Sequence, residues 1–160
     1  MGNTMKRTGA RSSLEVWEPP PPNMFKLNFY GASKEKPGPN GFRGAIRNSE
    51  SSMVGLYWQY IRENTNNVVE LKGLHVGIAM ASTYGWFPII LEGDSQLILQ
   101  MTTKLLHGKM INKVADNWRM AHSLEQLRAL LRDQSKVHTH HVKRKASRLA
   151  DLMAKYGVSQ

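Results

Sequence analysis

Four consecutive prolines, Pro19 to Pro22, constrain the fold of this chain more than any other feature of its sequence. Proline fixes the backbone dihedral φ and lacks an amide hydrogen, so this run predicts an extended spacer and excludes a helix before Asn23. Apolar and polar side chains then alternate from Phe25 to Tyr30, which is the period of a strand with two different faces. We therefore expect a basic, proline-rich tail at residues 1–23 and one folded domain at residues 24–160.

The length and composition of the chain favour a folded protein with an anionic partner. Its 160 residues are 41% hydrophobic, which is enough for one core of ordinary size. Twenty-two Lys and Arg residues against 12 Asp and Glu residues give a net charge of +10. Nucleic acid is the natural partner of such an excess, although a soluble basic protein without that partner has the same composition. No apolar run reaches the roughly 20 residues that a membrane span needs, so no membrane partner is expected.

Hydrophobic periodicity predicts both strands and helices along the domain. Turn formers at 33–41 and 51–52 separate three extended runs, as in an antiparallel meander. Gly73 and Gly77, four residues apart, would let the first helix approach the sheet closely. The expected strands are 25–30, 42–48, 53–61, 87–91 and 136–142. The expected helices are 68–81, 95–102, 110–131, which is one long helix or two joined ones, and 146–156. This order predicts an α/β domain with a mixed sheet, in which a right-handed crossover places the fourth strand parallel beside the first.

Three acidic residues stand where this scheme ends a strand or begins a helix. They are Glu70 near the start of the first helix, Asp94 after the buried strand 87–91, and Asp151 in the last helix. Such positions can converge at one edge of a sheet, and three carboxylates together favour a hard cation. The absence of cysteine excludes thiolate ligands and disulfides. Spacing alone also allows each acid simply to stabilise the dipole of a nearby helix start.

Several short motifs, in the same order along the chain, resemble those of ribonuclease H domains. The resemblance is closest to the reverse-transcriptase-like, retrotransposon-derived branch that is abundant in plants, and it covers roughly residues 17–156. The motifs are Trp17 with Pro19–Pro22, Lys26-Leu27-Asn28 with Gly31-Ala32, Pro37–Phe42, Val69–Leu74, Glu92–Ser95 and His141–Ala154. The resemblance implies a ribonuclease H-like fold, with a five-stranded mixed sheet of three antiparallel and two parallel strands and helices on both faces.

The resemblance also implies a nuclease that cuts the RNA strand of an RNA–DNA hybrid with Mg²⁺ held by four carboxylates. Glu70, Asp94 and Asp151 match three of these catalytic and metal-binding acids, and His141 resembles the histidine that precedes the last one. Tyr30 stands where the family has its first aspartate. A neutral phenol is a poor metal ligand, so this departure predicts weak or absent hydrolysis, with Mg²⁺ the expected metal if any is bound.

A nucleic-acid contact surface is predicted from the resemblance and the charge pattern together. The resemblance implies that backbone amides of one loop read the shallow minor groove of the duplex. The predicted contacts are Asn40, Gly41, His141, Lys143, Arg144 and Lys145. His138 and His140 share one face of the last strand, where a zinc pair is an alternative, but no third ligand has matching spacing.

Three functions are compatible with these observations. The first is a ribonuclease H-like domain that binds an RNA–DNA hybrid or structured RNA with little or no cleavage. The second is an active, Mg²⁺-dependent hybrid ribonuclease, and the third is a structural subunit that contacts other protein subunits of an RNA-containing assembly. An intracellular location is expected, and the compartment (nucleus, cytoplasm or organelle) stays open. Residues 1–16 resemble either a short transit-like tail, which would favour an organelle, or a disordered leader.

Overall fold

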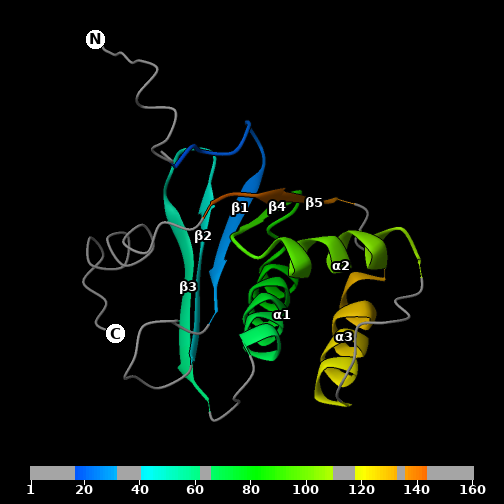
Figure 1. Ribbon diagram of the computed structural model, residues 1–160. Coiled ribbons are helices and arrows are strands. Elements are labelled where there is room, and N and C mark those ends of the chain that lie inside the picture. The colour runs from blue at the N-terminus through cyan, green and yellow to red at the C-terminus, as the bar shows by residue number, and fades with distance from the viewer. Residues whose placement is uncertain (1–16, 32–40, 62–65, 110–117, 133–135, 144–160) are drawn as a thin grey trace.

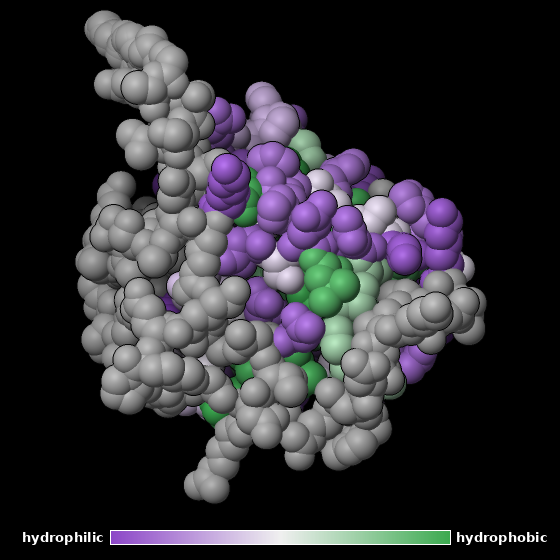
Figure 2. All heavy atoms as spheres, viewed as in Figure 1, coloured by the Kyte–Doolittle hydropathy of each residue, from purple (hydrophilic) through white to green (hydrophobic). Residues whose placement is uncertain are grey.

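The computed structural model describes residues 17–31, 41–61, 66–109, 118–132 and 136–143 of the 160-residue chain. Within these residues no helix has the length and apolar character needed to cross a bilayer. On the side shown in Figure 2, most of the described surface is hydrophilic and apolar residues form a small central patch. This distribution is expected when most apolar side chains are in the core.

A five-stranded mixed sheet is the centre of the structure (Figure 1). Its strands are β1 (Phe25–Tyr30), β2 (Gly41–Asn48), β3 (Met53–Tyr60), β4 (Ile89–Gly93) and β5 (Val137–His141). The strand order is β3-β2-β1-β4-β5. Strand β2 is antiparallel to both β1 and β3, and β4 is parallel to both β1 and β5. The predicted mixed sheet is therefore confirmed, as is the predicted placement of the fourth strand parallel to and beside the first.

Three described helices pack on one face of the sheet. They are α1 (Asn66–Tyr84), α2 (Gln96–Leu106) and α3 (Trp118–Leu131). Helix α1 packs on β1 and β2, α2 packs on β4 and β5, and α3 packs against α1. The helix expected at 146–156, and with it the helical cover of the second face, lies outside the described residues, as do residues 110–117 of the long helix expected at 110–131.

Two glycines allow α1 to pack closely against the sheet, as their spacing predicts. A Cβ added at Gly73 would lie 2.9 Å from Phe42 Cβ, and one at Gly77 would lie 2.5 Å from Leu27 Cδ2. The buried Tyr57 hydroxyl donates a 2.6 Å hydrogen bond to the Gly73 carbonyl across this contact. Burial raises the pKa of Tyr57 far above its ordinary value, so the phenol stays neutral.

The fourth strand begins later than the apolar run predicts. Strand β4 begins at Ile89 rather than at residue 87, because Trp86 and Phe87 use their amides in the turn that follows α1. Proline 88 has no amide to donate to a neighbouring strand. Helix α2 continues to Leu106, beyond the expected end at 102, because Leu105 extends its buried apolar face. The alternation predicted over Phe25–Tyr30 is confirmed, with Leu27 and Phe29 in the core beneath the helices.

Candidate functional site

One edge of the sheet gathers the described candidate residues. The parallel strands β1, β4 and β5 all end there, and the start of α1 lies against the end of β1. A Cβ added at Gly31, directly after β1, would overlap Glu70 Cγ. Glycine at position 31 is therefore needed for the Glu70 side chain to lie over the end of β1. We call the group Gly31, Glu70, Asp94 and His141 the carboxylate edge.

Asp94 and His141 meet at the same edge from neighbouring strands. The Val142 amide donates a 2.9 Å hydrogen bond to the Gly93 carbonyl, which continues the pairing of β4 with β5 past the last ladder residues. His141 Nε2 lies 3.2 Å from the Asp94 carbonyl oxygen, within hydrogen-bonding distance. Of the three acids predicted to converge at one sheet edge, Glu70 and Asp94 lie at this end of the sheet, and Asp151 lies outside the described residues.

Other predicted site residues are only partly described. Gly41 begins β2 and Lys143 is exposed just after β5, and both lie at the end of the sheet where β1 ends. Asn40, Arg144, Lys145 and Asp151 lie outside the described residues. Lysine 136 stands at the opposite end of β5, where its carbonyl accepts from the Ile89 amide.

Tyr30 occupies the last position of β1, beside the carboxylate edge. It pairs with Arg43 of β2, and the Arg43 guanidinium carbon lies 5.1 Å from the centre of the Tyr30 ring. Partial burial lowers the pKa of Arg43, an effect that the nearby Tyr60 opposes. Arginine remains protonated in proteins, so the Arg43 cation lies against the aromatic ring of Tyr30.

The described residues do not fit a complete carboxylate site for two metal ions. Among the described side chains there is no cluster of three or more His, Cys, Asp or Glu residues able to hold a metal. Of the predicted carboxylate ligands only Glu70 and Asp94 are described, and the Tyr30 phenol offers one weakly coordinating oxygen. The positive charge of Arg43 further disfavours a dication near Tyr30.

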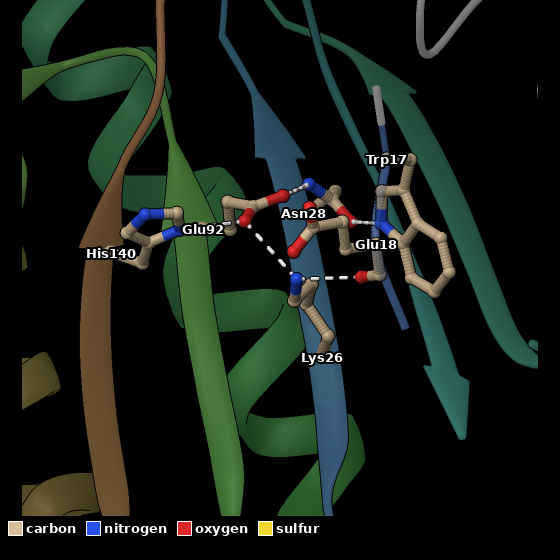
Figure 3. Close-up of polar contacts among 6 residues, drawn as sticks. All are labelled: Trp17, Glu18, Lys26, Asn28, Glu92 and His140. Carbon is tan, nitrogen blue, oxygen red and sulfur yellow. Dashed lines mark hydrogen bonds and ion pairs between the residues drawn. The ribbon is translucent and has the colours of Figure 1, made fainter. Parts of the chain in front are cut away.

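A buried carboxylate, Glu92, organises a polar network on the opposite face of the sheet from the helices (Figure 3). The Asn28 amide nitrogen donates a 2.7 Å hydrogen bond to Glu92 Oε1. Glu92 Oε2 lies 2.8 Å from His140 Nδ1 and 3.3 Å from Lys26 Nζ. Because a carboxylate only accepts, His140 Nδ1 is the donor in this bond.

Trp17 extends the network into the segment before the prolines (Figure 3). Its indole Nε1 donates a 2.7 Å hydrogen bond to Asn28 Oδ1, and Lys26 Nζ donates to the Glu18 carbonyl at 2.7 Å. The Arg47 guanidinium carbon lies 3.6 Å from the centre of the Trp17 ring. These contacts attach the segment at Trp17 and Glu18, upstream of the expected domain start at residue 24, to strands β1 and β2.

The network stabilises the ionised form of Glu92. Burial alone would raise the pKa of this carboxyl, but hydrogen bonds from Asn28 and His140 and the charge of Lys26 together lower it below its ordinary value. Glu92 of β4 pairs with Asn28 of β1, and Asn28 lies two residues before Tyr30 on the same face of β1. Its oxygens are committed to these partners, so Glu92 does not substitute for the aspartate expected at position 30.

No role for the Glu92 side chain follows from the motif Glu92–Ser95 alone. A useful signal was nevertheless present, because a charged residue within a strand predicted to be buried needs polar partners. Lys26 and Asn28 lie on the polar face of the first strand, which the predicted crossover places beside Glu92. The participation of Trp17 and His140 depends on tertiary contacts that no local pattern reveals.

Comparison with known families agrees with this fold. A family model described as reverse transcriptase-like matches residues 28–157. The chain belongs to this reverse transcriptase-like family. The match includes the end of β1 and all of α1 and β4, which position the carboxylate edge, and it continues beyond β5.

Individual relatives and solved structures are also ribonucleases H by name. An Arabidopsis thaliana protein named "Putative ribonuclease H protein" is 27% identical over 143 residues, or 89% of this chain. The chain spans about a fifth, 22%, of that relative. The RNase H1 structure from Halobacterium salinarum is 26% identical with a TM-score of 0.59, covering 76% of this chain and 86% of that one.

A second similar structure was solved with a nucleic acid bound. LC11-RNase H1, from a compost metagenome, was crystallised in complex with an RNA/DNA hybrid. It is 20% identical to this chain with a TM-score of 0.63, covering 80% of this chain and 91% of that one. At this level of identity the likeness concerns the fold, and the reverse transcriptase-like domain described here has the ribonuclease H fold.

Proposed function

We propose that this domain binds an RNA–DNA hybrid or structured RNA and has little or no hydrolytic activity. The observation that carries the proposal is Tyr30 at the carboxylate edge, with the Arg43 guanidinium against its ring. In this proposal Glu70, Asp94, Asp151 and His141 are the remnant of a hydrolytic site. The domain would then be a nucleic-acid-binding pseudoenzyme derived from a retrotransposon-type ribonuclease H.

The loss of hydrolysis follows from the chemistry of position 30. A neutral phenol, with a pKa of about 10, cannot bridge two cations as a carboxylate can. Metal-ion stabilisation of the transition state contributes several kcal/mol, and about 1.4 kcal/mol corresponds to a tenfold change in rate. Replacement of one shared ligand is therefore expected to slow cleavage by orders of magnitude, and Mg²⁺ binding is expected to be weak.

Binding is supported by charge and by the placement of the contact residues. The chain carries a net charge of +10, and Lys143 is exposed at the same end of the sheet as Gly41 and the carboxylate edge. A hybrid bound at this edge would meet Lys143 together with Asn40, Arg144 and Lys145 if those residues act as the motifs suggest. The complex of LC11-RNase H1 with an RNA/DNA hybrid supports the choice of ligand.

An active, Mg²⁺-dependent ribonuclease is the second candidate, because Glu70 and Asp94 keep their places beside Gly31 and His141. A structural subunit of an RNA–protein assembly is a further candidate, for which the basic composition is the supporting observation. Cleavage and binding assays on the purified protein distinguish the three.

The binding test compares two lysines at opposite ends of β5. Because each phosphate contact releases condensed counterions, Lys143→Ala should make the slope of log affinity against log salt shallower by about 0.9 on duplex ligands. Lys136→Ala removes the same charge from the other end of the strand and should leave the slope unchanged. The ligands are a labelled RNA–DNA hybrid, double-stranded RNA and double-stranded DNA, titrated at several salt concentrations.

Two outcomes would contradict the binding proposal. One is an affinity that does not respond to salt, and the other is an equal effect of Lys143→Ala and Lys136→Ala. Equal affinity for all three duplexes would leave binding intact and remove selectivity for the hybrid.

A further inference from the structure

Three side chains lie in a row across strands β1, β2 and β3, beginning beside the carboxylate edge. Tyr30 of β1 pairs with Arg43 of β2, and Arg43 pairs with Trp58 of β3. Residues opposite one another in adjacent strands project from the same face, so Arg43 lies between two aromatic residues there, with its guanidinium carbon 5.1 Å from the centre of the Tyr30 ring. Tyr60 is two residues beyond Trp58 on the same face and pairs with Gly41. We call the two β3 residues Trp58 and Tyr60, together with the neighbouring Arg43, the aromatic row; Tyr30 is not part of it.

Both rings of the aromatic row, those of Trp58 and Tyr60, are exposed to solvent. Trp58 is 48% exposed and Tyr60 is 57% exposed, whereas most other large apolar side chains of the described residues are buried. Strand β3 is an edge strand of the described sheet, so its outer side has no neighbouring strand there. A Cβ at Gly41 would lie 3.2 Å from Tyr60 Cδ1, which places the Tyr60 ring over the Gly41 backbone. The rings therefore cover the sheet on one side and face solvent on the other.

The position and charge of the row agree with an anionic ligand. Strand β3 runs in the same direction as β1, so Trp58 and Tyr60 lie at the end of the sheet that carries Glu70 and Asp94. Arg43 supplies a positive charge between the rings and the edge, and the chain as a whole is strongly basic. Base stacking on aromatic side chains, supported by arginine, is the usual way in which proteins bind single strands.

The spacing of the rings favours a single strand over a duplex. Alternate residues of a strand are about 6.6 Å apart, which is twice the rise of about 3.3 Å per residue. Stacked bases in a duplex rise by about 3.4 Å, so the two rings do not match successive stacked bases. They match one base each of an extended, unpaired strand.

We propose that Trp58 and Tyr60 form a stacking platform for two unpaired nucleotides of a single-stranded segment that continues from a duplex at the carboxylate edge. This inference rests on the proposed nucleic-acid function and specifies its ligand as a junction between duplex and single strand. Stacking on one ring contributes about 5- to 150-fold in affinity per base.

The test measures affinity for a hybrid that has a short single-stranded overhang. Three labelled ligands are compared at one salt concentration: the hybrid with an overhang, the same hybrid with an abasic overhang, and the blunt hybrid. The abasic overhang keeps the phosphates and removes the bases, so it isolates stacking. The wild type should prefer the overhang with bases at least about fivefold over the abasic one.

Variants of the row assign the effect to its rings. Trp58→Ala should abolish most of this preference while leaving affinity for the blunt hybrid and the salt slope unchanged. Trp58→Phe keeps an aromatic ring and should retain most of the preference. Tyr84→Ala is the matched control, because Tyr84 is 66% exposed at the C-terminal end of α1 and lies outside the row.

The results separate this inference from the proposed function. Equal affinity of the wild type for normal and abasic overhangs overturns the platform, and so does an unchanged preference in Trp58→Ala; both would assign the exposed rings to a protein contact. In either case binding of the blunt hybrid, with the Lys143 salt effect, would leave the proposed function standing. Loss of the preference in Trp58→Ala but not in Trp58→Phe, in a protein with unchanged circular dichroism, supports the platform.

Discussion

Asn28 and Glu92 face each other on adjacent parallel strands and share a 2.7 Å hydrogen bond in the buried part of the sheet. Asn28 also accepts from the Trp17 indole, and Glu92 also accepts from His140. The pair therefore links β1, β4 and β5 with the segment before the prolines. These three strands end at the carboxylate edge, so the pair fixes their relative register just behind it.

Glu92→Gln is expected to destabilise the domain by about 3–5 kcal/mol. The variant leaves the buried Lys26 without its carboxylate and presents an amide where Lys26 and His140 need an acceptor. Urea denaturation followed by circular dichroism measures the change. Glu125→Gln is the control, because Glu125 pairs with Arg128 on the surface of α3 and its loss should cost less than about 0.5 kcal/mol. A loss below about 1 kcal/mol for Glu92→Gln would show that the network contributes little.

The same carboxyl predicts how stability depends on pH. The pKa of Glu92 is lower in the folded protein than its ordinary value of 4.5, so the folded state favours the ionised form. Its contribution is fully present above about pH 4.5 and is lost as the pH falls through the lower, folded pKa. Denaturation at a series of acidic pH values should therefore show a steeper decline for the wild type than for Glu92→Gln. If the stability of the wild type and of Glu92→Gln fell equally with decreasing pH, groups other than Glu92 would be responsible for the loss of stability in acid.

Trp17→Ala should lower the free energy of unfolding by about 2–3 kcal/mol, from the lost indole hydrogen bond and the lost contacts of the ring with Arg47 and Lys26. Trp17→Phe keeps a ring and removes only the indole N–H, so it should lose about 1 kcal/mol. Thermal and urea denaturation of both variants measure the two contributions. Unchanged stability in Trp17→Ala would mean that the segment before the prolines is not part of the folded unit.

Much of the fold could be predicted because its signals are local. The alternation over Phe25–Tyr30 identified the first strand and its core face, and the short apolar run before Glu92 identified a central one. The spacing of Gly73 and Gly77 predicted the close packing of α1. These features depend on residues near one another in sequence, where periodicity and steric limits act directly.

The candidate site could be predicted only in part. The reasoning from strand ends and helix starts concerned Glu70, Asp94 and Asp151: the first two lie where β1 and β4 end, and Asp151 lies outside the described residues. The partner of Tyr30 depends on the register between β1 and β2, and no pattern in the sequence reveals that Arg43 is the residue opposite. Arg43 matters because a carboxylate introduced at position 30 would lie next to a guanidinium, and an ion pair would compete with a metal.

Cleavage of a labelled RNA–DNA hybrid in Mg²⁺ by the wild type, by Tyr30→Asp and by Tyr30→Asp combined with Arg43→Ala tests the central claim most directly. The account predicts near-background cleavage by the wild type, higher cleavage by Tyr30→Asp, and the highest by the double variant, since the guanidinium no longer pairs with the new carboxylate. Adding Glu70→Gln to the double variant should abolish the gain. Robust cleavage by the wild type that disappears in Glu70→Gln would contradict the account and make the protein an active ribonuclease H.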